Sequence, residues 1–219
     1  MQKFSLFIFA FATLFFMESV AAQVYNTEPE LKKLLQDRLS KDHKISDAAT
    51  KELEKITEAS FPVLLKFAQK EKPCVAVMAG QVIASKAPNY PKLTEAYGKI
   101  ARGAAFSDLV NLQDTAMCRR AATFALAMTT DGLKIILSML KDGSTWEKQS
   151  AIFALDNLTE GAGYPPGGVD VMKEIIPVLG RMQNAKDETI SVMSSEVLSQ
   201  LTRDGVPELA ELAKKVFQE

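Results

Sequence analysis

Four segments of the chain align with one another without gaps, and each has the pattern of a helix with one apolar side. Each begins with polar residues or follows a proline, carries small residues in the middle, and ends on a small-then-large apolar pair. The four segments are residues 74–83, 117–126, 146–155 and 189–198. Small residues at equivalent places let helices of neighbouring repeats approach closely. The sequence therefore predicts a stack of repeated helical units.

Other amphipathic helices precede these segments. They are expected at Phe61–Phe67, Gly132–Leu140 and Ile175–Met182, and a last half-repeat at Val206–Ala213. The anchor positions Val82, Ala125, Ala154 and Val197 are separated by 43, 29 and 43 residues. The longer spacings predict an extra helix or loop in two of the units. No convincing run of alternating apolar and polar residues predicts a β-strand.

Three motifs resemble HEAT-like repeats. Val206-Pro207-Glu208-Leu209 is similar to the start of their first helix, Leu140-Lys141-Asp142 to their turn, and Arg119 to Leu126 to their second helix, with Arg119 as its basic residue. The resemblance covers roughly residues 60–218 and implies an all-α, right-handed α-solenoid of about four and a half helix pairs. We assign residues 60–219 to this repeat domain and residues 23–59 to an N-terminal helical cap. In the cap, helices are expected to open at Asn26–Glu30 and at Ser46.

The first 22 residues have the three parts of a secretory signal peptide. Lys3 is the only early positive charge, and an apolar run from Phe4 to Met17 follows, too short to span a bilayer comfortably. Val20-Ala21-Ala22 supplies the small residues at a cleavage site. We expect cleavage between Ala22 and Gln23, and therefore a periplasmic or secreted product without stable membrane insertion.

The composition is that of an ordinary globular protein, with 47% hydrophobic and 24% charged residues. The formal net charge of -1 offers no basic field for nucleic acid or an anionic membrane. The only histidine, His43, is expected in a charged surface connector, and no metal-binding or nucleotide-binding motif occurs. We therefore predict no catalysis, no metal and no cofactor.

The two cysteines, Cys74 and Cys118, are expected in the first turns of equivalent helices, one position out of register. An oxidising compartment favours a disulfide between them. Residues one step out of register point in directions about 100° apart. Two buried, unlinked thiols are therefore an equal alternative. A third reading is a redox-active pair, since a helix N-terminus lowers the pKa of a thiol.

Residues 160–168 form a segment rich in glycine and proline that cannot continue a helix. It is interpreted as a long connector between helices that end near Leu158 and begin near Val169. The alternative is a binding loop with Tyr164 as its anchor. The candidate loop residues are Gly161, Gly163, Tyr164, Pro165, Pro166 and Gly167. Tyr90-Pro91 and Tyr97 are expected in the preceding long insertion, on an edge of the solenoid comparable to that of this loop.

Two hypotheses for function follow. The first is an exported, non-catalytic scaffold that binds a protein or peptide on a concave surface with exposed apolar or aromatic residues. Trp146, at the start of its helix, would be either an exposed recognition residue or a residue that packs the turn onto the neighbouring repeat. The second hypothesis is a redox or modifying factor on the same solenoid, using Cys74 and Cys118.

Overall fold

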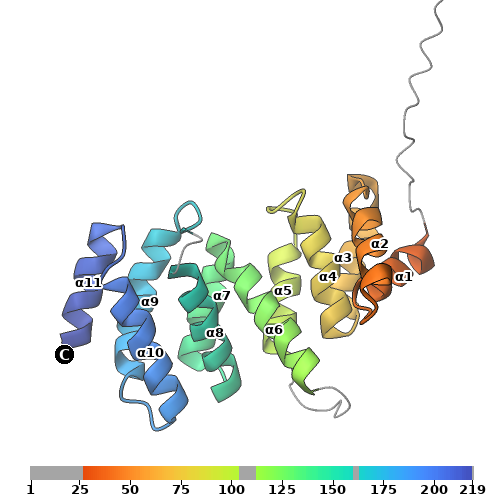
Figure 1. Cartoon of the computed structure of the whole chain (residues 1–219). Helices are drawn as coiled ribbons and strands as arrows, with labels where there is room; N and C mark the ends of the chain where they lie inside the picture. Colours follow the sequence, from red (N-terminus) through yellow and green to blue (C-terminus); the bar gives the residue numbers. More distant parts are fainter. Residues whose placement is uncertain (1–26, 104–111, 160–162, 219) are drawn as a thin grey trace, which may run out of the picture.

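The computed structural model describes residues 27–103, 112–159 and 163–218, which are almost entirely helical and contain no β-strand (Figure 1). The α-helices are α1 (Glu28–Arg38), α2 (His43–Glu54), α3 (Phe61–Lys70), α4 (Pro73–Ala84), α5 (Leu93–Arg102), α6 (Leu112–Ala127), α7 (Thr130–Asp142), α8 (Thr145–Asn157), α9 (Gly168–Met182), α10 (Glu188–Leu201) and α11 (Pro207–Gln218). A short 3₁₀ helix, η1 (Glu58–Ser60), leads into α3.

The helices from α3 onward form two layers. Helices α3, α5, α7, α9 and α11 make the A layer, and α4, α6, α8 and α10 make the B layer, which lies in front in Figure 1. Each helix packs against its pair partner and against the next helix of its own layer. Four pairs and one half-pair result, which confirms the predicted all-α solenoid of about four and a half units.

The core lies between the two layers and runs the length of the stack. Alanines at the predicted small positions, such as Ala79, Ala122 and Ala154, are completely buried. Large side chains of the A layer, among them Leu64 and Ile136, fill the space beside them. Because alanine has no bulk beyond Cβ, neighbouring helices can approach until their other side chains interlock.

Helix α1 packs against both helices of the first pair, and α2 packs against α1. Glu28 on α1 forms an ion pair with Lys66 on α3 at 2.6 Å. Helix α2 begins at His43, three residues before the predicted start at Ser46, because the Asp42 carboxylate accepts a hydrogen bond from the Lys44 amide and caps the helix. Ser46 is instead buried and hydrogen-bonded to Arg38. His43 is exposed, as expected, but in the first turn of a helix and not in a connector.

Helix α5 lies between the first two aligned segments, in the first 43-residue spacing, and pairs with α6. Its buried residues Leu93, Ala96, Tyr97 and Ile100 have the i, i+3, i+4, i+7 spacing of an apolar stripe, a signal that the sequence contains and the sequence analysis missed. Tyr97 lies in the middle of this helix and is buried against Gly80 of α4, where a Cβ would meet the ring at 2.7 Å. The expectation that Tyr97 lies in an insertion at the edge of the fold is therefore wrong. Burial raises the pKa of the Tyr97 hydroxyl.

Among the described residues, no helix combines the length and apolar character that a membrane span requires. The predicted cleavage site at Ala22 and Gln23 lies outside these residues.

Candidate functional site: the exposed face of the B layer

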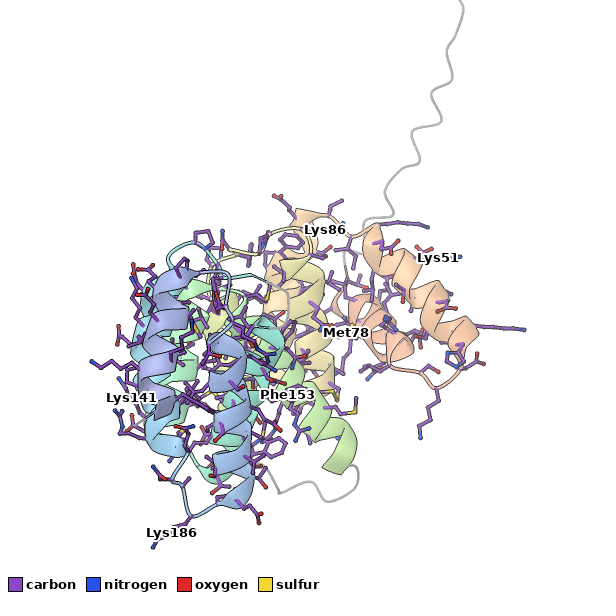
Figure 2. All side chains as sticks on the ribbon, turned by 60° about the vertical axis from the view of Figure 1, so that its left-hand side comes forward. Lys51, Met78, Lys86, Lys141, Phe153 and Lys186 are labelled. Carbon is purple, nitrogen blue, oxygen red and sulfur yellow. A yellow bond between two sulfur atoms is a disulfide. The ribbon has the colours of Figure 1, made fainter. Side chains whose placement is uncertain are left out.

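The solvent-facing side of the B layer carries large apolar side chains. Met117 and Phe124 on α6 expose 64% and 36% of their surface, and Val192 on α10 exposes 50%. Between them, Trp146 and Phe153 on α8 are half-buried. We call the surface formed by these five residues and Arg120 the B-layer face. Figure 2 labels one residue of this surface, Phe153 of α8.

Arg120 of α6 joins the aromatic residues of α8. Its guanidinium carbon lies 5.4 Å from the centre of the Trp146 ring and 5.2 Å from that of Phe153. Trp146 and Phe153 are seven residues apart, which places them on the same side of α8 about two turns from each other. The arginine is therefore held by cation–π contacts to two rings at once. It is exposed, and no carboxylate of the described residues forms an ion pair with it.

Trp146 combines the two roles considered for it. It follows Ser144, which caps α8 in a reciprocal arrangement with Glu147: the Glu147 amide donates to the serine hydroxyl at 3.3 Å, and the glutamate accepts from the Ser144 amide at 2.7 Å. The indole nitrogen is buried and has no hydrogen-bond partner among the described residues. One part of Trp146 thus packs into the protein, and its ring also contacts the exposed Arg120.

Arg119, the neighbour of Arg120, points into the protein. Its side chain is 7% exposed and donates a hydrogen bond to the carbonyl of Gly103, which ends α5. A cation at a helix C-terminus is favourable because the last carbonyls carry partial negative charge. Burial lowers the pKa of the Arg119 guanidinium. The basic residue of the HEAT-like motif therefore has a structural contact, and the adjacent arginine faces solvent.

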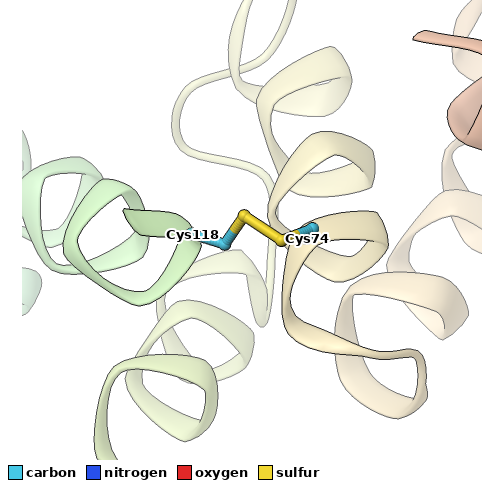
Figure 3. Close-up of a disulfide and its surroundings, with 2 residues drawn as sticks. All are labelled: Cys74 and Cys118. Carbon is cyan, nitrogen blue, oxygen red and sulfur yellow. A yellow bond between two sulfur atoms is a disulfide. The ribbon is translucent and has the colours of Figure 1, made fainter. Parts of the chain in front are cut away.

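Cys74 and Cys118 form a disulfide that joins α4 to α6 within the B layer (Figure 3). Their Cα atoms are 5.0 Å apart. Helices whose axes are about 8–10 Å apart bring facing Cα atoms to this distance, because each Cα lies about 2.3 Å from its axis. The two residues face each other although the alignment places them one step out of register.

The opposite face, on the A layer, carries ion pairs on α5, α7 and α9. Lys99 pairs with Glu95 on α5 at 3.0 Å, and Lys134 with Asp131 on α7 at the same distance. A groove of about 580 Å³ lies between α5 and α7, lined by Gly98, Lys99, Arg102, Lys134, Ile135 and Ser138 among others. Arg102 donates to Ser138 at 2.8 Å. The cations of this groove are thus already engaged within the protein.

The glycine- and proline-rich segment connects α8 to α9. Gly161 lies outside the described residues, and Gly163 and Gly167 have φ angles of 71° and 74°, which suit glycine. The half-buried Tyr164 donates its hydroxyl hydrogen bond to Asp204, beyond the end of α10. Burial and, secondly, this hydrogen bond raise the pKa of Tyr164. Its hydroxyl therefore holds the segment against the fold.

Pro165 and Pro166 of this segment meet the loop that contains Tyr90 and Pro91. Together with residues at the start of α7 they line an edge pocket of about 360 Å³. The Thr130 hydroxyl donates to the carbonyl of Pro166 across it. The ring of Tyr90 contacts Phe61 edge-on, with centroids 5.4 Å apart. The structure thus brings the two predicted edge regions together, with the exception of Tyr97.

No group of three or more histidine, cysteine, aspartate or glutamate side chains with the arrangement of a metal site occurs in the part of the chain that the structure describes.

No protein-family model and no curated protein matches the chain. Among solved structures, it is similar to a designed armadillo repeat protein in complex with the peptide (KR)4, with 14% identity and a TM-score of 0.43, covering 85% of this chain and 87% of that one. It is also similar to an engineered protein, with 13% identity and a TM-score of 0.40, covering 86% and 97%. These similarities concern the arrangement of the helices alone.

Sequence reasoning missed most of the B-layer face. Trp146 was considered singly, and Arg120, Phe124 and Phe153 were not singled out. The gap-free alignment contains the signal, since Phe124 and Phe153 occupy the same position in consecutive segments. Their exposure depends on which side of the helix the A layer covers.

Proposed function

We propose that this chain is an exported, non-catalytic scaffold that binds another protein through the B-layer face. The observation that carries the proposal is the contrast between the two faces of one solenoid. Met117, Phe124 and Val192 are exposed on the B layer, whereas Phe217 near the C-terminus is the exposed large apolar side chain that the described A-layer helices carry, and α5 and α7 present paired charges. A group of exposed large apolar residues on a soluble repeat protein is typical of an interaction site.

Export is a separate part of the proposal. It is supported by the tripartite pattern of residues 1–22 and by the disulfide between Cys74 and Cys118, since disulfides persist mainly in oxidising compartments. N-terminal sequencing of the protein from the periplasmic or secreted fraction tests it. We expect a chain that begins at Gln23. A chain in the cytosolic fraction that retains Met1 or residue 2 would contradict it.

The binding surface is tested by affinity capture with matched variants. Wild type, Phe124→Ser and Phe217→Ser are used to capture proteins from the native compartment, and the captured proteins are quantified by mass spectrometry. Phe217 on α11 is a suitable control because it exposes 44% of its surface, close to the 36% of Phe124. We expect Phe124→Ser to lose a partner that Phe217→Ser retains. Equal retention by both variants, or a loss only with Phe217→Ser, would refute the assignment of this face.

The edge pocket between Pro165–Pro166 and Tyr90–Pro91 is proposed as a secondary contact for the same partner. Its residues come from the predicted binding loop, and its volume of about 360 Å³ is large enough for a side chain. Tyr90→Ala is expected to weaken capture less than Phe124→Ser does, because the pocket lies at the edge of the fold.

The second candidate function is a redox factor that uses Cys74 and Cys118. The observation in its favour is that both residues are only half-buried, so that a reagent can approach the bond. Thiol titration of the native protein after mild reduction separates the two functions. A redox factor requires a disulfide that opens and closes reversibly in the folded protein, so a bond that resists mild reductant would exclude this second function.

A further inference from the structure

Arg120 is held in place before any partner arrives. Its guanidinium lies beside two rings of α8, at 5.4 Å from the centre of Trp146 and 5.2 Å from that of Phe153. A free arginine side chain loses rotamer freedom when it binds a ligand, and one that already contacts two rings has lost part of it beforehand. Aromatic rings are not ordinary hydrogen-bond acceptors, so these contacts leave the N–H groups of the guanidinium available as donors.

The surroundings of Arg120 indicate what these donors recognise. No described carboxylate pairs with it, whereas Lys99, Lys134 and Lys173 on the A layer each have an acidic partner at 2.9–3.0 Å. Carboxylates are the groups that match the planar fork of arginine with two parallel hydrogen bonds. An exposed arginine that is held in place and has no acidic partner among the described residues is therefore complementary to a carboxylate.

Apolar side chains lie on either side of the cation along α6. Met117 and Phe124 are three residues before and four residues after Arg120, and helical residues at these spacings share one side. They are about 10.5 Å apart along the helix, which an extended chain covers in about three residues. A ligand of matching shape has an acidic residue between two apolar ones.

Glu196 limits the part of the B-layer face that can accept an acidic group. It is exposed on α10 and occupies the position of Phe124 and Phe153 in the aligned segments. A second acidic group on the ligand would be repelled there. The positive part of the face is thus confined to the region between α6 and α8.

We propose that Arg120, Trp146 and Phe153 form a subsite for the carboxylate of an acidic residue, flanked by apolar side chains, on the protein partner. This inference rests on the proposed function, because it names the chemistry of the partner that the B-layer face binds. Arg120 contacts the carboxylate, and Trp146 and Phe153 position the guanidinium.

Selection from a random library of 12-residue peptides tests the subsite. The targets are the disulfide-intact protein, Arg120→Glu, and the control Arg181→Glu, which changes an exposed arginine on α9 in the other layer. We expect peptides with Asp or Glu beside apolar residues to be enriched by wild type and by Arg181→Glu. Arg120→Glu should lose that enrichment. Enrichment of neutral or basic peptides by wild type, the same acidic peptides selected by Arg120→Glu, or no enrichment at all would overturn the inference.

Affinity measurements separate a ligand contact from a merely structural role. Trp146 is the only tryptophan of the chain, so its fluorescence reports on this subsite. A selected peptide and its Glu→Gln counterpart are titrated against wild type and Arg120→Gln. We expect the Gln peptide to bind wild type at least about tenfold more weakly, and both peptides to bind Arg120→Gln equally. If Arg120→Gln keeps the full preference for Glu, the subsite is refuted. Thermal melting confirms that the variants are folded.

The inference and the proposed function fail in different ways. If peptides bind without preference for acidic residues, and Phe124→Ser abolishes their binding, the B-layer face is a docking surface but the carboxylate subsite is wrong. If the capture experiment also gives equal results for Phe124→Ser and Phe217→Ser, the proposed function is wrong as well.

Discussion

The two faces of this solenoid are built from helices of similar length and differ in how their surface groups are paired. On the A layer, Lys173 of α9 contacts both Asp170 and Glu208, at 3.2 and 2.9 Å. On the B layer, Arg120 has two aromatic contacts and no acidic partner among the described residues, and Phe124 is exposed beside it. The cations of the A-layer groove are thus engaged within the protein, whereas Arg120 on the B layer lies among exposed apolar groups.

The adjacent arginines show the same difference within one helix. Arg119 is buried and donates a hydrogen bond to the carbonyl of Gly103, and Arg120 is exposed and makes a cation–π contact with Trp146. Both occur in the motif that resembles a HEAT-like second helix. The motif alone therefore does not tell a structural arginine from one available to a ligand.

The largest expected effect comes from the disulfide, which fixes α4 to α6 within the B layer. It closes a loop with a sequence separation of 44 residues. Replacing both cysteines by serine is expected to lower the free energy of unfolding by about 2–4 kcal/mol, because the unfolded chain regains conformational freedom. Urea denaturation followed by circular dichroism measures the loss. A change below about 0.5 kcal/mol would show that the B layer does not depend on this link.

A smaller effect is expected for Arg119. The variant Arg119→Gln should lower the free energy of unfolding by about 1.5–3 kcal/mol, since a hydrogen bond from a buried charged donor is lost. The matched variant Arg120→Gln should lower it by about 0.5–1 kcal/mol, the range for an exposed cation–π contact. Chemical denaturation of both variants under the same conditions provides the comparison. The reverse order would contradict the assignment of Arg119 to structure and of Arg120 to binding.

The smallest effect is expected on the A layer. Lys134→Gln breaks the ion pair with Asp131, whose members expose 64% and 80% of their side chains. Exposed pairs of this kind contribute about 0–1 kcal/mol, so the midpoint of denaturation should hardly move. Partner capture should also remain at the wild-type level. A clear loss of capture would instead place the binding surface on the A layer.

Much of the fold follows from the sequence, because strong apolar stripes and small residues recur at equivalent positions. The break between α8 and α9 was predicted at Leu158 and Val169, and these helices end at Asn157 and begin at Gly168. Helix α5 was missed although Leu93, Ala96 and Ile100 have the spacing of an apolar stripe, because the stretch between the first two aligned segments was interpreted as an insertion.

The candidate site was harder to predict than the fold. The contact of Arg120 with Trp146 and Phe153 joins two helices, and it depends on the packing of α6 against α8. The alignment of the repeats shows which positions are equivalent, but it does not show which of them are covered by the A layer. The disulfide was uncertain for the same reason. Whether Cys74 and Cys118 face each other is decided by how the helices pack and not by their register in the alignment.

The central claim, that the B-layer face binds a protein partner, is tested most directly by photo-crosslinking in the native organism. p-Benzoylphenylalanine replaces Phe124 in one strain and Phe217 in another, so that two aromatic residues of similar exposure carry the same reactive group. After irradiation, the account predicts a discrete adduct with a second protein from position 124 and none from position 217. Adducts from position 217 alone, or none from either position, would contradict it.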